Sequence, residues 1–564
     1  MSDDHSKPRG FLASLAVFTE WRILIMLGLG FAAGLPNLLI FDTLSAWLRD
    51  AGYTLQIISF FGLVTLVYSF KFLWAPLVDR TTIPRLTTWL GHRRSWMLVT
   101  QTAIIAGLVI ISSFDPKSNL VVVAVFAALT GFSSATQDIV IDAWRIEAAD
   151  LSRQGAMAAA YQWGYRIAII VAGAVPLFLA DVFGWNISYG LMAALMTIGI
   201  GAVLMAPAEK AHTIRPIPTV GIAPQPGREL AEWVIRLVII SIGALLLGTG
   251  LAGRDDILVR AVKMLGSPAA ADCLHGLWSA PATGDWCQLA VVLAGFTVIV
   301  ISAWPLPGIK TRPGVYLSHA LGDPLSDFFK RSGKMAGLIL ALICLYRLSD
   351  FVLNIMTPFY LDLGFTKTEV AEVRKIFGVP MSMIGVFLGG WAVARFGIMR
   401  PLIAGAFTLP FANSIFSWLA IQGPDMTSLF VTIGVDNIVS GYAGTCLVAY
   451  MSSLTSAGFT ATQYALFSSL YSLPGKLIAS QSGRIVETAA HAAEPGGSLA
   501  FLRKLFAHTP LDAFAVAMAK SHVSPAALGS GYVVFFFYSG LVGVAAMVIV
   551  LLVARQEKRA KASS

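Results

Sequence analysis

The sequence has few charged residues for its length and very few cysteines. Only 13% of its 564 residues are charged, about half of what is usual in a soluble domain. Four cysteines are too few for a disulfide framework, and neither CxxC nor HExxH occurs, so we expect no metal, no cofactor and no enzyme activity. Its 40 basic residues are scattered in short clusters, so the net charge of +9 does not indicate nucleic-acid binding.

Long apolar runs take the place of the missing charge. Hydrophobic residues make up 56% of the chain and the mean hydropathy is +0.74, which leaves room for a dozen or more spans of about 20 residues. We therefore predict an all-α polytopic membrane protein with fourteen spans, arranged as six, two and six. They lie near 22–47, 56–78, 95–113, 119–143, 156–180, 186–206, 232–252, 287–306, 335–360, 369–394, 400–421, 427–454, 461–487 and 531–554.

The distribution of lysine and arginine predicts the orientation. With a cytoplasmic N-terminus, 23 of these residues fall in inside loops and 9 in outside loops, so we expect both termini in the cytoplasm. Residues 1–20 are mostly polar, and no cleavable signal peptide is evident. Cys273 and Cys287 then lie in one outside loop, where an oxidising compartment permits a disulfide between them without requiring one.

An internal repeat divides the chain into two six-span parts. Asp50-Ala51-Gly52-Tyr53-Thr54 recurs as Asp362-Leu363-Gly364-Phe365-Thr366, each time after the first span of its part. Two six-span repeats joined by a linker are typical of major facilitator transporters, whose substrate site lies between the repeats. We predict an N-terminal repeat at 1–206, linkers with two extra spans at 207–333, and a C-terminal repeat at 334–564 with a periplasmic amphipathic segment at 488–530.

The loop after the second span resembles the signature loop of the major facilitator family. It reads Pro76-Leu77-Val78-Asp79-Arg80 and, after an insertion, Gly91-His92-Arg93-Arg94, with Ala75 and Pro76 where a glycine is expected. The resemblance implies an inside gate in which the aspartate binds a helix N-terminus, an arrangement that the helix dipole favours. The gate residues would be Asp79, Arg80, Arg93, Arg94 and Arg145, although simple positive-inside anchoring also explains Arg93 and Arg94.

The fourth span carries the densest group of polar residues. Ser134, Asp138, Asp142 and Arg145 fall on one helical stripe. An ionised carboxylate at membrane depth costs several kcal/mol, so such groups face a wet cavity, form pairs or bind protons. The deeper Asp138 is our candidate proton carrier, whereas Asp142 and Arg145 form either a local pair or part of the gate.

Other polar residues at similar depth complete a candidate site. A wide polar cavity of this kind suits a sugar or peptide better than a lipid or a bare ion. Charge pairing that only holds the helices together, such as Lys71 or Arg166 with Asp138 and Arg347 with Asp350, is the alternative. The candidates for proton coupling are Asp138, Asp350 and Asp142, and those for substrate binding are Tyr68, Lys71, Gln137, Gln162, Tyr165, Arg166, Asn354 and Gln463.

A glycine-rich run in the first span, Gly28-Leu29-Gly30-Phe31-Ala32-Ala33-Gly34, has the spacing of a dinucleotide-binding fingerprint. It lies inside an apolar helix and follows no strand. We therefore interpret it as a site of close helix packing.

Several runs together resemble the AmpG muropeptide permeases. They are Gly30–Pro36, Lys71–Arg80, Ala135–Trp144, Gly164–Arg166 and Ala461–Leu466, and the resemblance is weakest over 207–333 and 488–530. It implies proton-driven import of N-acetylglucosaminyl-1,6-anhydro-N-acetylmuramic acid, with or without peptide, across a bacterial inner membrane. It also implies a role in peptidoglycan recycling and in β-lactamase induction.

The partners expected from this resemblance are a small glycopeptide, protons and membrane lipid, and we expect a monomer. The alternative is a major facilitator exporter, or a transporter of another polar metabolite such as an acyl-coenzyme A, because eukaryotic acetyl-coenzyme A transporters share parts of these runs. A membrane-embedded enzyme would need a metal motif or a nucleophile with a base, and the sequence offers neither. A sensor would need a soluble signalling domain, and none is evident.

Overall fold

The computed structural model describes most of the chain as helices. The described residues are 17–52, 68, 70–207, 223, 225–252, 255–280, 283–302, 311–352, 355–366, 369–370, 372–479, 482–510, 513–514 and 523–563, and no strand occurs among them. Nine helices in this part are long and apolar enough to cross a membrane, which confirms the all-α membrane class, while the count of fourteen spans stays a prediction. The chain forms two compact units, Ile214–Arg331 and the rest.

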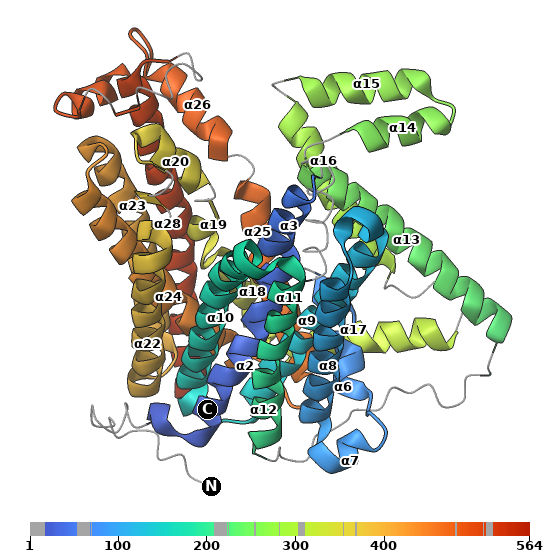
Figure 1. Ribbon diagram of the computed structural model, residues 1–564. Coiled ribbons are helices and arrows are strands. Elements are labelled where there is room, and N and C mark those ends of the chain that lie inside the picture. The colour runs from blue at the N-terminus through green and yellow to red at the C-terminus, as the bar shows by residue number, and fades with distance from the viewer. Residues whose placement is uncertain are drawn as a thin grey trace. The chain divides into compact units, whose positions relative to one another are not determined.

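Residues 17–207 form the N-terminal half of the larger unit (Figure 1). Its helices follow the predicted spans, except that the span predicted at 56–78 lies largely outside the described residues. The helices are η1 (Val17–Thr19), α2 (Trp21–Leu38), η2 (Leu39–Thr43), α3 (Leu44–Asp50), η4 (Lys71–Leu73), α6 (Ala75–Arg80), α7 (Leu86–Leu90), α8 (His92–Ser113), α9 (Pro116–Glu147), η5 (Leu151–Arg153), α10 (Gln154–Phe183), α11 (Trp185–Leu195) and α12 (Thr197–Met205).

Residues 332–563 form the C-terminal half of the same unit. In the segment 488–530 the described residues form the end of α26, the short helix η9 and the start of α28. The helices are η6 (Gly333–Met335), α18 (Ala336–Leu345), α19 (Leu348–Val352), α20 (Met356–Leu363), η8 (Glu372–Phe377), α22 (Gly378–Phe396), α23 (Met399–Gln422), α24 (Met426–Ser453), α25 (Thr460–Ala479), α26 (Ser482–Ala492), η9 (Ala500–Phe506) and α28 (Pro525–Ser563).

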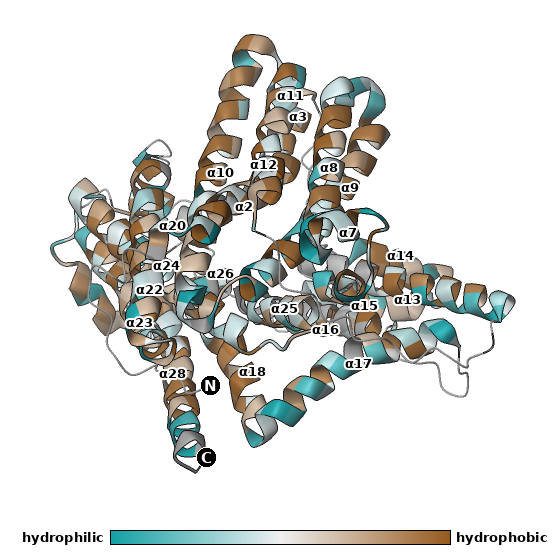
Figure 2. Cartoon of the chain, turned by 90° about the horizontal axis from the view of Figure 1, so that it is seen from below, coloured by the Kyte–Doolittle hydropathy of each residue, from teal (hydrophilic) through white to brown (hydrophobic). Residues whose placement is uncertain are grey.

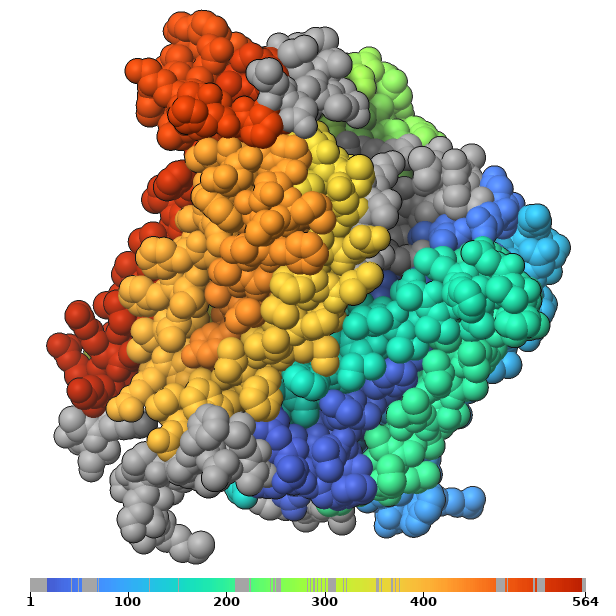
Figure 3. All heavy atoms as spheres, turned by 60° about the vertical axis from the view of Figure 1, so that its left-hand side comes forward, coloured from blue at the N-terminus to red at the C-terminus, as the bar shows by residue number. Residues whose placement is uncertain are grey.

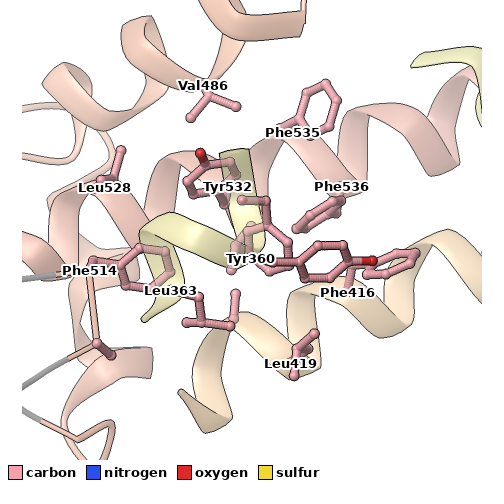
Figure 4. Close-up of a cluster of buried hydrophobic side chains, with 14 of the residues drawn as sticks. Tyr360, Leu363, Phe416, Leu419, Val486, Phe514, Leu528, Tyr532, Phe535 and Phe536 are labelled. Atoms are coloured by element: carbon pink, nitrogen blue, oxygen red, sulfur yellow. The ribbon is translucent and has the colours of Figure 1, made fainter. Parts of the chain in front are cut away.

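Each half has its own core of buried apolar side chains. In the C-terminal half, rings from α20, α23 and α28 pack together, and Phe514 of the segment after α25 joins them (Figure 4). Phe359 and Phe536 meet edge to face with ring centroids 4.9 Å apart. The segment 488–530 is therefore part of the folded bundle, because it covers one end of α28.

The repeated Asp-x-Gly motif performs the same structural task in both halves. The glycine of each copy follows the last helix of the first span of its half, α3 or α20, and has a positive φ, 90° for Gly52 and 117° for Gly364. Asp50 accepts a hydrogen bond from the Trp185 indole at 2.9 Å, and Asp362 accepts one from the Tyr532 hydroxyl at 2.5 Å. Both aromatic residues lie near the start of the last span of their half, so each aspartate ties the first span to the last.

Glycines of α2 allow it to lie directly against α10. A Cβ on Gly30 would come within 2.1 Å of the Tyr161 carbonyl oxygen, and one on Gly34 within 2.6 Å of the Tyr165 carbonyl oxygen. The interpretation of the glycine-rich run as a packing site is confirmed.

Residues 214–331 form the second unit, described here by itself. Helices α13 (Pro226–Ala252) and α16 (Gly284–Ser302) occupy the two extra spans and pack side by side, with Gly243 of α13 against Ile299 of α16. The remaining helices are α14 (Asp256–Met264), α15 (Pro268–Ser279) and α17 (Arg312–Ser332). In Figure 2, α17 carries alternating hydrophilic and hydrophobic segments, unlike the mainly hydrophobic α11 and α12.

The two cysteines of this unit are free thiols. Cys273 is exposed on α15, and Cys287 is partly buried on α16. The disulfide that the sequence permits is therefore not formed in this structure, in which the two residues lie on separate helices.

Candidate functional site at the seam between the halves

Small residues bring the two halves of the larger unit into contact. A Cβ on Gly155 of α10 would lie 2.5 Å from the Val393 side chain, and one on Gly390 of α22 would lie 2.7 Å from Ala159. Further along α10, the Trp163 indole donates to the Met383 carbonyl oxygen at 2.8 Å. Figure 3 shows α10 in teal along the yellow and orange surface of the C-terminal half. We call this boundary between the halves the seam.

The carboxylate of Asp79 crosses the seam to the first turn of α25. It accepts hydrogen bonds from the main-chain amides of Ala461 at 3.2 Å and Thr462 at 2.8 Å, and from the Thr462 hydroxyl at 2.7 Å. A negative charge at these otherwise unsatisfied amides is favoured by both hydrogen bonding and the helix dipole.

Arg93 holds Asp79 in place from its own half. Its guanidinium is completely buried and donates to Asp79 at 2.7 Å and to Glu147 at 2.8 Å. The Arg80 guanidinium lies over the Phe459 ring at 5.7 Å, whereas Arg94 donates to the main-chain oxygens at the end of α12 within the N-terminal half. Of the basic residues in this loop, Arg80 and Arg93 therefore take part in contacts at the seam.

Arg145 makes a second bridge across the seam. Its guanidinium donates to the Ser452 hydroxyl of α24 at 2.9 Å and lies over the Tyr464 ring of α25 at 5.1 Å. It also pairs with Asp142 of its own helix at 3.3 Å. We use the name closed end for the part of the seam around Asp79, Arg145 and Gly155.

Lys71 pairs with a different carboxylate from the one the sequence suggested. Its ammonium lies 3.9 Å from Asp142, so the expected partner Asp138 has no salt bridge among the described residues. Asp138 is nine-tenths buried, and its Oδ1 has no hydrogen-bond partner in the described part of the chain. The neighbouring amide of Gln137 is fully buried and also lacks a partner among those residues. The fourth span thus presents unsatisfied polar groups one turn before the ion pairs of the closed end.

A second polar cluster lies in the C-terminal half. Arg347 donates to Asp350 at 2.8 Å and to the Tyr471 hydroxyl at 3.1 Å, and it also contacts the Ser440 hydroxyl. The expected Arg347–Asp350 pair is therefore present. From the other half, Gln162 donates to Thr445 at 3.1 Å and joins this region.

The remaining predicted residues divide among several places. The Tyr165 hydroxyl accepts a hydrogen bond from Asn37 at 2.7 Å, and Arg166 lies one turn after Gln162 on α10. The Tyr68 hydroxyl is buried beside the Ser134 side chain. Gln463 is buried and accepts a hydrogen bond from the main-chain amide of Ser456 in the loop before α25. Asn354 lies outside the described residues.

Four residues of the seam escaped the sequence analysis. They are Glu147, Ser440, Ser452 and Tyr471, which bind the arginines already discussed. Glu147 pairs with Arg93, more than fifty positions earlier in the chain, so its sequence position carries no signal of this partner. Serine and tyrosine are common in apolar helices, so their sequence positions alone carry no signal of a partner.

Comparisons with known proteins agree with this architecture. The family model of the Major Facilitator Superfamily matches residues 83–479, well over half of the chain. An anhydromuropeptide permease of Escherichia coli K12 is 30% identical over 84% of this chain and 76% of its own. A putative transporter, AmpG 4, of Rickettsia conorii is 27% identical over 83% of this chain and 91% of its own.

A solved structure supports the fold alone. The proton:xylose symporter XylE superimposes with a TM-score of 0.51 at 11% sequence identity, covering 95% of both chains. The family match, the curated relatives and the two helical halves lead to one conclusion. This chain is a multi-pass membrane transporter that belongs to the Major Facilitator Superfamily, with AmpG-type permeases among its relatives.

Proposed function

We propose that this protein imports anhydromuropeptides from periplasm to cytoplasm across a bacterial inner membrane, coupled to protons. The observation that carries the proposal is the 30% identity to an anhydromuropeptide permease over 84% of the chain. The polar residues of the seam agree with it, because a glycopeptide needs many hydrogen-bonding partners. Major facilitator proteins have their substrate site between the two repeats, where these residues lie.

The closed end supports an alternating-access mechanism. The bonds of Asp79 to Thr462 and of Arg145 to Ser452 join the two halves. Under the expected orientation this end faces the cytoplasm, so its contacts would have to break before substrate could leave there. Rocking of one half against the other would then open one end as it closes the other.

Asp138 is the proposed proton carrier. Its carboxylate is buried, and one of its oxygens has no hydrogen-bond partner among the residues that the structure describes. Ionisable groups at membrane depth are typical members of proton relays. Asp142 is a weaker candidate because Lys71 and Arg145 already neutralise it.

Uptake of radiolabelled anhydro-disaccharide tests the proposal. The chain would be expressed in cells lacking their own permease, with and without a protonophore, and its presence in the membrane checked by immunoblot. We expect uptake that the protonophore abolishes. Uptake that resists the protonophore would refute proton coupling, and no uptake by protein present in the membrane would refute the proposed substrate.

A further inference from the structure

Arg166 carries a partly buried charge that forms no ion pair in the described part of the chain. It lies on α10, one turn after Gln162, and its side chain is partly buried. It makes no ion pair or hydrogen bond with a described residue, in contrast to Lys71, Arg93, Arg145 and Arg347. A guanidinium in this environment is expensive unless it meets an anion.

The charged and polar groups that interact electrostatically with Arg166 come from both halves, so Arg166 lies at the seam. They are Arg347 and Tyr471 of the C-terminal half and the adjacent Tyr165 of its own helix. Arg347 repels it, and no described carboxylate is among the groups that act on its charge. Burial and Arg347 disfavour the positive charge of Arg166, and no described carboxylate compensates for them.

Two carboxylates of the seam are engaged elsewhere, and Asp138, which has no salt bridge to a described residue, is not among the groups that act on Arg166. Asp350 pairs with Arg347 and accepts a hydrogen bond from Ser440, and Asp142 pairs with Arg145. Gly444 leaves room for the Arg347 guanidinium, because a Cβ there would lie 3.0 Å from its Nη1. Arg347 is held by Asp350, whereas Arg166 has no carboxylate partner in the described part of the chain and can receive an anion from outside the protein.

We propose that Arg166 binds a carboxylate of the transported substrate. A guanidinium donates two parallel hydrogen bonds to a carboxylate, which gives both affinity and orientation. Gln162 lies one turn earlier on the same face of α10, where it can contact the same ligand. If the substrate is a muropeptide, its carboxylate is either the free lactyl group or the C-terminus of the stem peptide. This choice of substrate rests on the proposed function.

Calorimetric titration of the purified full-length protein tests this. The ligands are the anhydro-disaccharide with a free lactyl carboxylate, its lactyl methylamide, and the tripeptide-bearing form. We expect the Arg166→Gln variant to bind a ligand with the recognised carboxylate about 10- to 100-fold more weakly than the wild type does. It should bind the methylamide, which lacks the lactyl carboxylate, as tightly as the wild type does. An effect on the free disaccharide assigns the lactyl group, and an effect on the tripeptide form assigns the peptide carboxylate. Arg400→Gln, which changes an exposed arginine at the start of α23, is the matched control and should bind like the wild type.

Two further measurements separate this inference from a structural role and from the proposed function. The ligand-free Arg166→Gln variant should melt at the wild-type temperature or above it, because an unneutralised charge is removed. Sodium D-lactate, compared with sodium chloride at equal ionic strength, should raise the melting temperature of the wild type but not of the variant.

Three results would overturn the assignment. In the first, the variant and the wild type bind every ligand equally well. In the second, the variant loses affinity for all three ligands equally and its melting temperature falls. In the third, lactate raises the melting temperature of both proteins equally. If the wild type responds to lactate through Arg166 but binds no muropeptide, the anion site stands and the proposed function fails.

Discussion

The carboxylate of Asp79 lies 2.8 Å from the main-chain amide of Thr462, so a residue of the N-terminal half caps a helix of the C-terminal half. Arg93 holds the other side of the same carboxylate at 2.7 Å. Because both side chains are buried, this three-membered arrangement depends on the halves staying together at the closed end. Breaking it is the structural requirement for opening that end.

We predict that Asp79→Asn lowers both stability and transport. The amide keeps one acceptor for α25 but leaves Arg93 with a single carboxylate partner, so we expect a loss of about 2 to 4 kcal/mol in the free energy of unfolding. Denaturant unfolding in detergent and uptake rates measure the two effects. Asp181→Asn, an exposed change near the end of α10, is the control. Wild-type stability and uptake in Asp79→Asn would contradict the gate assignment.

Arg145 and Ser452 should be energetically coupled across the seam. A hydrogen bond from a buried guanidinium contributes about 1.5 to 3 kcal/mol, so Arg145→Gln and Ser452→Ala should each destabilise the protein. Their double variant should lose less than the sum of the two, with a coupling energy of about 1 kcal/mol or more. Unfolding of all four proteins in one detergent measures the coupling. Strict additivity would mean that the 2.9 Å contact contributes nothing.

Asp138→Asn should separate transport from proton coupling. The asparagine cannot carry a proton, so we expect net uptake against a gradient to be lost while exchange of labelled for unlabelled substrate continues. Asp142→Asn is the comparison. It removes the charged partner of Lys71 and Arg145, so its effect should come from weakened contacts at the closed end. Proton-driven uptake that survives in Asp138→Asn would show that this residue is not the carrier.

The free thiol of Cys273 offers a test of the orientation. This cysteine is exposed on α15 and lies in a loop that the lysine and arginine count places outside. A membrane-impermeant maleimide should therefore label it in cells with a permeabilised outer membrane, without prior reduction. Cys273→Ser should remove most of that label. Labelling that appears only after lysis would place Cys273 on the cytoplasmic side. Labelling that appears only after reduction would show that Cys273 is in a disulfide.

The N-cap of α24 should make a pH-dependent contribution. Hydrogen bonds from Ser428 to the Asp425 carboxylate lower the pKa of that group, which lies outside the span. A lowered pKa in the folded state means stability that is present above the ordinary value of 3.8 and is lost as pH falls through the folded pKa. The melting temperature of the wild type should thus approach that of Asp425→Ala as pH drops from 6 to 3. A constant gap would show that the cap acts without its charge.

The spans and the repeat follow from the sequence because both are local properties. An apolar run of about 20 residues must be helical in a membrane, since its main-chain groups have no water to bind. Both copies of the Asp-x-Gly motif end a helix, because glycine adopts a positive φ at little cost. The carboxylate and guanidinium stripe of the fourth span was likewise visible from helical spacing alone.

The choice of partners was decided only in the tertiary structure. Sequence spacing allowed Lys71 to pair with Asp138, yet its ammonium lies beside Asp142, and Arg166 pairs with no carboxylate that the structure describes. Which side chains meet depends on the depth and rotation of each helix, and these are set by close contacts such as Gly155 against Val393. Such contacts join residues more than 200 positions apart, and no local pattern encodes them. The sequence thus determined which helices form and which polar groups they carry, and packing of the two halves determined which of those groups remain available to a substrate.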